Sequence, residues 1–270
     1  SYPMSPSTDV LVNFAKYSEE FNIVVEQAED EICAVNMAVA SWYAGGRAMA
    51  TTSGGGFALM TEGLSLAGAV ESPLVIHIGQ RPGPATGMPT RTEQGDLLFS
   101  LFSGHGEFPR IIYAPGNHSQ GFDLSQKAFH MADKYQVPVI LLTDQYFLDS
   151  YSTIPEVKIE KSTSANIAIE TDSGYRRYQL TETGISPRGI PGYGTGIVCL
   201  DSDEHDEGGY ITEDFTVRVA QVNKRMRKLQ SMGSDSIPPD LYGPDDYRCL
   251  IVSWGSTLNG ILEAISVSGR

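Results

Sequence analysis

The sequence predicts an α/β fold, with a doubly wound, mostly parallel sheet in the first part of the chain. Between Phe21 and Leu148, short β-branched runs alternate with longer segments of helical periodicity, which is typical of a sheet covered by helices. Nearly all of the strand-like runs are continuously apolar, as expected when both faces of the sheet are covered. In such folds ligands bind beyond the carboxyl ends of the strands, so functional residues are expected there.

Five strands and four helices account for this part of the sequence. The expected strands are residues 22–25, 48–52, 74–78, 110–113 and 137–142. The expected helices each follow a start signal of acidic, glycine, threonine or serine residues and are residues 32–43, 57–69, 94–103 and 120–135. We assign residues 1–155 to this domain.

A different pattern follows this domain. A polar stretch, residues 153–176, leads into a segment rich in glycine and proline, residues 184–196, that has no helical periodicity. A helix is expected at residues 214–232, and its basic end suits the negative end of the helix dipole. We therefore expect an irregular excursion, one helix and a linker in residues 156–245.

The last residues resemble the start of another domain. Prolines and glycines at residues 238–244 mark a boundary, after which we expect a strand at residues 249–253 and a helix at residues 258–267. One strand and one helix are too little to form a core of their own. Residues 246–270 are therefore expected to begin a second α/β domain, which continues in a longer polypeptide.

Charge and cysteine content narrow the function classes. The chain has 19 basic and 33 acidic residues, a formal net charge of −14, which opposes broad contacts with nucleic acid or anionic lipid. It contains no apolar run long enough to cross a bilayer, and its first residues lack the pattern of a signal peptide. The three cysteines lie far apart, which indicates a reducing compartment and no iron–sulfur cluster in this chain. We expect a cytoplasmic protein with no nucleic-acid or membrane partner.

A stiff loop follows the expected strand at residues 74–78. Residues 81–89 contain three prolines and two glycines, and loops of this kind at strand ends commonly position binding groups. Arg81 would stand at the carboxyl edge of the sheet, where its guanidinium can hold a carboxylate through two hydrogen bonds. The alternative, left equally open, is an ordinary crossover in which Arg81 pairs with Glu93 or Asp96.

Four acidic residues lie within residues 26–31, directly before the expected helix at residues 32–43. The common explanation is a helix cap, because carboxylates favour the positive end of the helix dipole. The functional alternative is that one of these acids is buried, has a raised pKa and shares a proton with a nitrogen atom of a ligand.

Other motifs carry weaker signals. Residues 51–56 lie between a strand and a helix, where backbone amides can bind an anion, but the chain has no G-x-G-x-x-G motif and no P-loop. His205 lies in a run of polar residues, which is more typical of a solvated loop than of a metal site. We expect no metal-ligand set in this chain.

Several segments match one family in their order and spacing. They are residues 2–8, 26–31, 50–57, 80–90, 92–97, 183–188, 201–208, 211–214 and 254–257. Together they resemble the alpha subunit of the 2-oxoacid:ferredoxin oxidoreductases, and most of all its 2-oxoglutarate branch. The resemblance implies a fold of the thiamine diphosphate pyrimidine-binding type for the first domain and a transketolase C-terminal-like fold for the last.

The resemblance also implies a function. The family oxidatively decarboxylates 2-oxo acids, here 2-oxoglutarate, to the acyl-CoA and reduces ferredoxin, and thiamine diphosphate supplies the carbanion chemistry that side chains cannot. By its place in the motifs, Glu31 corresponds to the catalytic glutamate that hydrogen-bonds the pyrimidine ring nitrogen, with Glu29 as the fallback. Ser53 and Gly54 lie in the corresponding cofactor-binding turn.

Three further residues correspond to the substrate-binding residues of the family. Arg81 would clamp the substrate carboxylate, while Ser5 and Thr90 would orient the 2-oxo acid. The sequence departs from the family pattern at two places. Met4 and Ser5 replace the usual Ile-Thr, and Gly55 replaces a proline in the usual Thr-Ser-Gly-Pro-Gly, so substrate preference and loop stiffness are expected to differ.

The family also implies partners. Its Gly-Asp-Gly magnesium–diphosphate motif and the cysteines of its [4Fe-4S] cluster lie on the beta subunit, so we expect Mg and the cluster there, in a hetero-oligomer that uses a 2-oxo acid, coenzyme A and ferredoxin. Because ferredoxins are typically acidic, a chain of net charge −14 should repel one, and electrons are expected to leave through the partner. Two alternatives stay open: a sibling that acts on pyruvate, branched-chain or aryl 2-oxo acids, and a non-catalytic scaffold subunit of the same fold.

Overall fold

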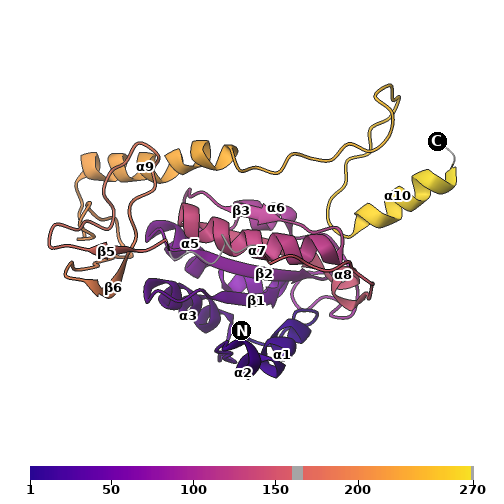
Figure 1. Cartoon of the computed structure of the whole chain (residues 1–270), viewed down its shortest axis with the longest axis horizontal. Helices are drawn as coiled ribbons and strands as arrows, with labels where there is room; N and C mark the ends of the chain where they lie inside the picture. The colour runs from indigo at the N-terminus through magenta and orange to yellow at the C-terminus, as the bar shows by residue number, and fades with distance from the viewer. Residues whose placement is uncertain (160–166, 269–270) are drawn as a thin grey trace.

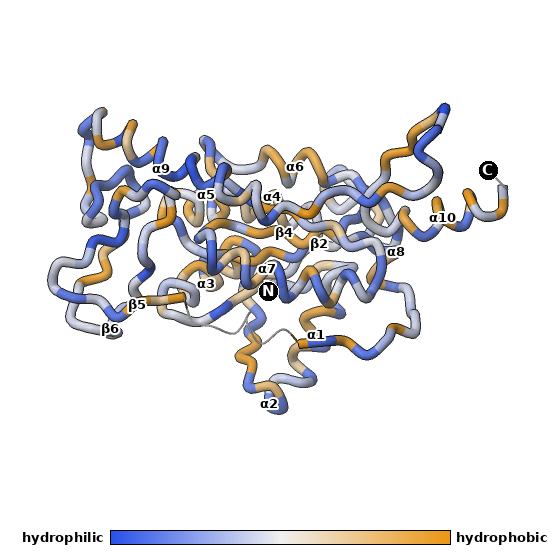
Figure 2. The backbone as a smooth tube through the Cα atoms, turned by 45° about the horizontal axis from the view of Figure 1, so that its top comes forward, coloured by the Kyte–Doolittle hydropathy of each residue, from blue (hydrophilic) through white to orange (hydrophobic). Residues whose placement is uncertain are grey.

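A four-stranded parallel sheet forms the centre of the chain. The computed structural model describes residues 1–159 and 167–268, and its main sheet has the strand order β1-β2-β4-β3 (Figure 1). The strands are β1 (Met49–Ser53), β2 (Leu74–Gln80), β3 (Ile111–Tyr113) and β4 (Pro138–Asp144). Every residue of β2 and β4 is buried, and Figure 2 shows apolar colour along both strands. The predicted parallel α/β fold is confirmed.

Helices pack on both faces of this sheet, because successive strand residues point to opposite faces. Ile76, Ile78 and Leu142 belong to one apolar core, which α3, α4 and α5 cover. Val75 and Val139 belong to the other core, which α7 covers. The helices are α3 (Glu31–Tyr43), α4 (Gly54–Leu59), α5 (Thr61–Ala69), α6 (Leu97–Phe102) and α7 (His118–Tyr135).

Two expected helices have different bounds in the structure. The helix expected at residues 57–69 begins at Gly54 and is divided at Met60 into α4 and α5. The helix expected at residues 94–103 is reduced to α6, because the backbone before it is held by other contacts. The Asp96 backbone N–H donates to Gln80 Oε1 at 3.0 Å instead of continuing a helix.

The strand expected at residues 22–25 is not formed. Helices α1 (Thr8–Lys16) and α2 (Ser18–Phe21) occupy the start of the chain, and Asn22 ends α2 in the left-handed region with φ 52°. The following residues run extended, but β1 pairs only with β2, and Val24 is 95% exposed. A β-branched run without a neighbouring strand has no ladder to join.

The segment after β4 contains more regular structure than expected. It holds α8 (Gln145–Asp149), a two-stranded parallel sheet of β5 (Ile169–Thr171) and β6 (Gly189–Gly194), and the expected helix as α9 (Phe215–Gly233). The basic residues of α9 were expected to suit the negative end of the helix dipole. The structure instead buries Lys224 and Lys228 against Glu71.

The strand expected at residues 249–253 is also absent. These residues pair with no strand of the described chain, and Val252 is 85% exposed. The helix that follows them is confirmed as α10 (Thr257–Ser268), while the division of the chain into domains stays a prediction. Among the described helices, none combines the length and the apolarity needed to span a membrane.

Candidate functional site

The candidate site lies where β1, β2 and β4 end. Ser53, Gln80 and Asp144 are the last residues of these three strands, so the loops that follow them meet at one edge of the sheet. The N-terminal loop reaches the same edge, because the Ser1 hydroxyl donates to the Thr51 carbonyl at 2.7 Å and Pro6 packs on Gly79.

The acidic patch contains both a helix cap and a buried acid. Asp30 is the N-cap of α3, and its carboxylate accepts a hydrogen bond of 2.7 Å from the Cys33 backbone N–H. Glu31, the next residue, is only 2% exposed, and its Oε1 atom has no hydrogen-bond partner. Glu29, the fallback, is exposed. Of the two residues, Glu31 therefore has the burial that the functional alternative requires, and a buried carboxyl oxygen without a partner is costly.

Gly56 of α4 makes room for the Glu31 side chain. A Cβ atom at Gly56 would lie 2.5 Å from Glu31 Oε1 and 2.8 Å from Glu31 Cγ. Any larger residue would push the carboxyl group away. The same Cβ atom would meet the Thr52 hydroxyl oxygen at a still shorter distance. The Thr52 hydroxyl contacts the sulfur of Met4 at 4.0 Å, so the N-terminal loop forms part of this wall.

Arg81 and Ser5 lie together, as the motifs predict. Arg81 Nη1 donates a hydrogen bond of 2.6 Å to the Ser5 carbonyl, and Arg81 Nε is buried without a partner. Within residues 1–159 and 167–268, no ion pair joins Arg81 to Glu93 or Asp96. The structure thus argues against the explanation in which Arg81 forms an internal ion pair with Glu93 or Asp96.

Thr90 is not brought to the other predicted residues. It is exposed, and its hydroxyl accepts only a long hydrogen bond of 3.4 Å from Arg91 Nη1. In the described part of the chain, no hydrogen bond links Thr90 to Arg81 or to Ser5.

Asp96 and Gln80 belong to the site although no motif role was predicted for them. A Cβ atom at Gly54 would lie 2.6 Å from Asp96 Oδ1, so the Asp96 carboxyl group rests on the predicted Ser53–Gly54 turn. Burial raises the pKa of Asp96, and the nearby Glu93 raises it further. The Ser53 hydroxyl is buried without a partner. The sequence held one signal for Gln80: it is a polar residue at the end of a fully buried strand.

Residues 254–256 return to the same edge of the sheet. Asp144 Oδ2 accepts hydrogen bonds from Gln94 Nε2 at 3.2 Å and from the Ser256 hydroxyl at 2.5 Å. Gln94 Nε2 also donates to the Trp254 carbonyl at 3.1 Å. The loop after β2, the end of β4 and a segment from the end of the chain are therefore joined beside the site.

His205 was expected in a solvated loop, and this prediction is wrong. Its side chain is buried, with its ring centroid 3.8 Å from that of Tyr178. Burial lowers the pKa of His205. The Tyr178 ring also lies 5.5 Å from the Nζ atom of Lys224 in α9, so His205 lies beside the buried charges of that helix and not at the candidate site.

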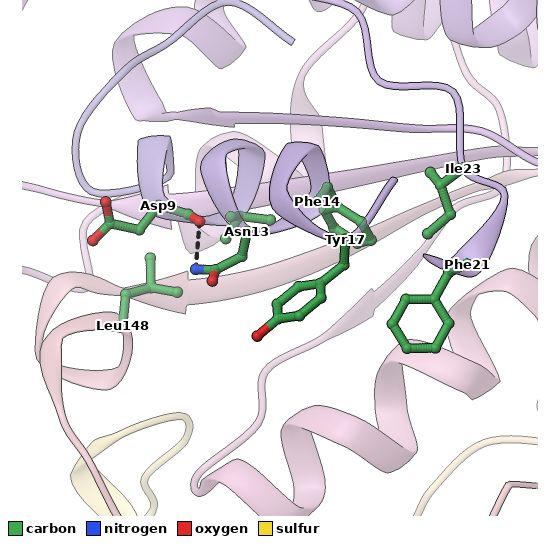
Figure 3. Close-up of a pocket in the computed structure, with 8 residues that line it drawn as sticks. Asp9, Asn13, Phe14, Tyr17, Phe21, Ile23 and Leu148 are labelled. Atoms are coloured by element: carbon green, nitrogen blue, oxygen red, sulfur yellow. Dashed lines mark hydrogen bonds between the residues drawn. The ribbon is translucent and has the colours of Figure 1, made fainter. Parts of the chain in front are cut away.

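A separate apolar pocket of about 410 Å³ lies against α1 and α2 (Figure 3). None of the predicted site residues lines it, and Figure 3 shows the Phe14, Tyr17 and Phe21 rings around it. Its lining is Asp9, Val10, Asn13, Phe14, Tyr17, Phe21, Ile23 and Leu148. The polar groups described above are therefore not part of this pocket.

Comparison with known proteins agrees with these motifs and this geometry. Residues 1–224 match the family described as pyruvate flavodoxin/ferredoxin oxidoreductase, thiamine diphosphate-binding. The subunit alpha of 2-oxoacid:ferredoxin oxidoreductase 1 of Sulfurisphaera tokodaii is 42% identical over 98% of this chain and 45% of its own length. A 2-oxoglutarate synthase subunit of Archaeoglobus fulgidus is 38% identical over 95% of this chain and 67% of its own length.

A solved structure shows the same fold. It is the 2-oxoglutarate:ferredoxin oxidoreductase from Magnetococcus marinus with 2-oxoglutarate, coenzyme A and succinyl-CoA bound, with a TM-score of 0.87 and 33% identity over 99% of this chain and 48% of that one. The chain thus spans less than half the length of this protein and of the Sulfurisphaera tokodaii relative. These matches confirm the resemblance seen in the sequence, and the chain belongs to the pyruvate flavodoxin/ferredoxin oxidoreductase family, whose thiamine diphosphate-binding domain its residues 1–224 match.

Proposed function

We propose that this chain is the alpha subunit of a 2-oxoacid:ferredoxin oxidoreductase that converts 2-oxoglutarate to its acyl-CoA and reduces ferredoxin. The relatives named as alpha subunits and as 2-oxoglutarate synthase subunits support the class. The observation that carries the proposal is Glu31, a buried carboxyl group whose Oε1 has no partner and for which the absence of a side chain at Gly56 leaves room.

The residues of this edge fit thiamine diphosphate. The bound cofactor would supply the electron sink that decarboxylation of a 2-oxo acid needs. Glu31 would hold a proton between its carboxyl group and the pyrimidine ring nitrogen, in surroundings that exclude water. The buried Ser53 hydroxyl, which has no partner, and the Gly54 backbone lie at the end of β1 and would contact the ring.

Arg81 would bind the substrate carboxylate. One of its nitrogens already holds the Ser5 carbonyl, which fixes the guanidinium plane, and its Nε is without a partner. A planar guanidinium held in this way can give a carboxylate two parallel hydrogen bonds. Ser5, and Thr90 after a movement of its exposed loop, would orient the 2-oxo acid.

A beta subunit would complete the enzyme. The relatives named as alpha subunits support a complex of different chains. In this proposal the beta subunit contributes Mg, the diphosphate contacts and the [4Fe-4S] cluster, and it passes electrons to ferredoxin. The cysteines of the described chain, Cys33, Cys199 and Cys249, are free thiols, which supports a cytoplasmic location.

The test is activity of the assembled enzyme. Co-expression with the beta subunit should give coenzyme A-dependent dye reduction, and Glu31→Gln should abolish it. Glu29→Gln is the matched control, because Glu29 lies two residues away and is exposed; it should keep full activity. Full activity of Glu31→Gln would contradict the assigned role.

Substrate choice needs its own experiment. A panel of 2-oxoglutarate, pyruvate, branched-chain and aryl 2-oxo acids should give the highest kcat/KM for 2-oxoglutarate. A preference for another acid would move the chain to a sibling enzyme. No thiamine diphosphate binding by the complex would favour a non-catalytic scaffold.

A further inference from the structure

Three segments that are distant in the sequence press against the Gly54-Gly55-Gly56 turn. A Cβ atom at Gly54 would lie 2.6 Å from Asp96 Oδ1, one at Gly55 would lie 3.3 Å from the Ala85 carbonyl oxygen, and one at Gly56 would lie 2.5 Å from Glu31 Oε1. The turn is therefore held between two carboxyl groups, Asp96 at its first glycine and Glu31 at its last.

Hydrogen bonds to the ends of β2 and β4 hold the backbone of Asp96 in place. Its backbone N–H donates to Gln80 Oε1 at 3.0 Å, and Gln80 Nε2 donates to the Thr143 carbonyl at 3.0 Å. Gln80 is fully buried, so these bonds tie the loop that carries Asp96 to the ends of β2 and β4. Asp96 stands at the N-cap of α6, but its side chain makes no capping hydrogen bond. Its carboxyl group is thus directed to the turn and not to its own helix.

The surroundings of the Asp96 carboxyl group favour its protonated form. Asp96 Oδ2 is buried and has no hydrogen-bond partner, and an ionised oxygen in that position is costly. The charged group that acts on it is Glu93, on its own loop, while Glu31 contacts the last glycine of the same turn. Burial and the charge of Glu93 raise the pKa of Asp96.

We propose that Asp96 is a positioning residue of this site, whose protonated carboxyl group packs on Gly54 and holds the turn where Gly56 supports Glu31. This inference rests on the proposed function of Glu31. Ionised Asp96 would place a negative charge without a hydrogen-bond partner against the turn, and the contact at Gly54 would loosen. Thiamine diphosphate affinity is then expected to fall as the pH rises through the pKa of Asp96.

Calorimetric titration of the assembled complex with thiamine diphosphate and Mg tests this without measuring turnover. Between pH 5 and pH 9, the wild-type affinity should fall by about tenfold. Asp96→Asn keeps the shape and cannot ionise, so its affinity should stay level over the same range. Asp96→Ala should bind about tenfold more weakly at every pH, and Gly54→Ala, which displaces the carboxyl group from the other side, should do the same.

Glu93→Gln tests the electrostatic part. Removal of this neighbouring charge lowers the pKa of Asp96, so the loss of affinity should begin at a lower pH. The proposal is overturned if Asp96→Asn keeps the wild-type pH profile or if Asp96→Ala binds like wild type. Failure of the proposed function looks different: wild type itself would not bind thiamine diphosphate, or Glu31→Gln would bind it equally well. Thermal melting of each complex shows that Asp96→Asn, the isosteric variant, remains folded.

Discussion

Arg81 donates a hydrogen bond of 2.6 Å to the backbone carbonyl of Ser5, a residue that precedes it by 76 positions. This bond connects the N-terminal loop to the end of β2. Because the acceptor is a backbone atom, the side chain of Ser5 stays available for another contact. The same bond sets the plane of the guanidinium, and it makes the position of Arg81 depend on the N-terminal loop.

Arg81→Ala should raise KM for the 2-oxo acid by about tenfold to a hundredfold. A hydrogen bond to a charged group contributes about 1.5–3 kcal/mol, which is a change of this size in binding. Steady-state kinetics of the complex checks it. Arg91→Ala is the control, because Arg91 is an exposed arginine of the same loop whose guanidinium hydrogen-bonds its neighbour Thr90. Unchanged KM in the Arg81 variant would remove the proposed clamp.

Gly56→Ala should abolish tight thiamine diphosphate binding. The added Cβ atom would clash with the Thr52 hydroxyl and lie 2.5 Å from Glu31 Oε1, so both side chains must shift and the carboxyl group must leave its buried place. Gly260→Ala provides the comparison, since a Cβ atom there meets nothing within 4 Å and the residue lies inside α10; alanine should stabilise that helix by up to about 1 kcal/mol. Equal cofactor affinity of the two variants, measured by calorimetry, would contradict the role of Gly56.

His77 should make the fold sensitive to acid. Its ring nitrogens lie 2.7 Å from the Thr51 hydroxyl and 2.8 Å from the Thr143 hydroxyl, and burial lowers the pKa of His77 from 6.5 to about 4. Between these values the unfolded chain binds a proton that the folded chain does not, so the free energy of unfolding falls by about 3 kcal/mol as the pH drops from 6.5 to 4.

Urea unfolding of wild type and His77→Gln at several pH values measures this effect. The glutamine variant lacks the titrating ring, so its free energy of unfolding should fall less over the same interval. Parallel curves for the two proteins would show that another group causes the acid sensitivity.

Lys224→Met should destabilise the chain by about 3 kcal/mol, because it removes a partner of a buried charge. Lys224 Nζ lies 2.5 Å from Glu71 Oε1, and both side chains are fully buried. Burial alone would raise the pKa of Glu71, but Lys228, Lys224 and Arg177 together outweigh it and hold that pKa well below its usual range. Glu71 therefore stays ionised and needs its cations.

Arg218→Met on the same helix is the matched control. Arg218 also forms an ion pair, with Glu204 at 2.8 Å, but its side chain is 58% exposed. An exposed pair of this kind contributes less than about 1 kcal/mol. Chemical unfolding should therefore show a clearly larger loss in the free energy of unfolding for the Lys224 variant. Equal losses in the two variants would show that burial does not strengthen the Lys224 pair.

Local patterns predicted the sheet well, because its strands are buried on both faces. Four of the five expected strands overlap β1 to β4, and the helices after Asp30 and before Gln136 were found from their caps and periodicity. The two wrong strands, residues 22–25 and 249–253, have the composition of strands but no neighbour to pair with. Pairing is a property of the whole fold, and composition alone does not contain it.

The site shows the same division. Motif order singled out Glu31, Arg81 and Ser5, and their roles stay a prediction. The structure shows that Asp30 caps α3 while Glu31 is buried, and that Arg81 bonds the Ser5 carbonyl. The role of Asp96 depends on its contact with Gly54, which only the folded chain reveals. Likewise, Lys224 pairs with Glu71, which lies 153 positions away in the sequence. The basic residues around Lys224 suggested a helix end, because the sequence does not show which residue the fold brings to them.

The contact of Trp254 with Gln94 supplies an optical reporter for this protein. The sequence contains two tryptophans. Trp42 is buried in the core beneath α7, whereas Trp254 is half-buried and its carbonyl accepts from Gln94 beside the site. Emission from Trp42 should stay constant when ligands bind, so a change in intrinsic fluorescence would come from Trp254 and would report events at the loop after β2 without any added label.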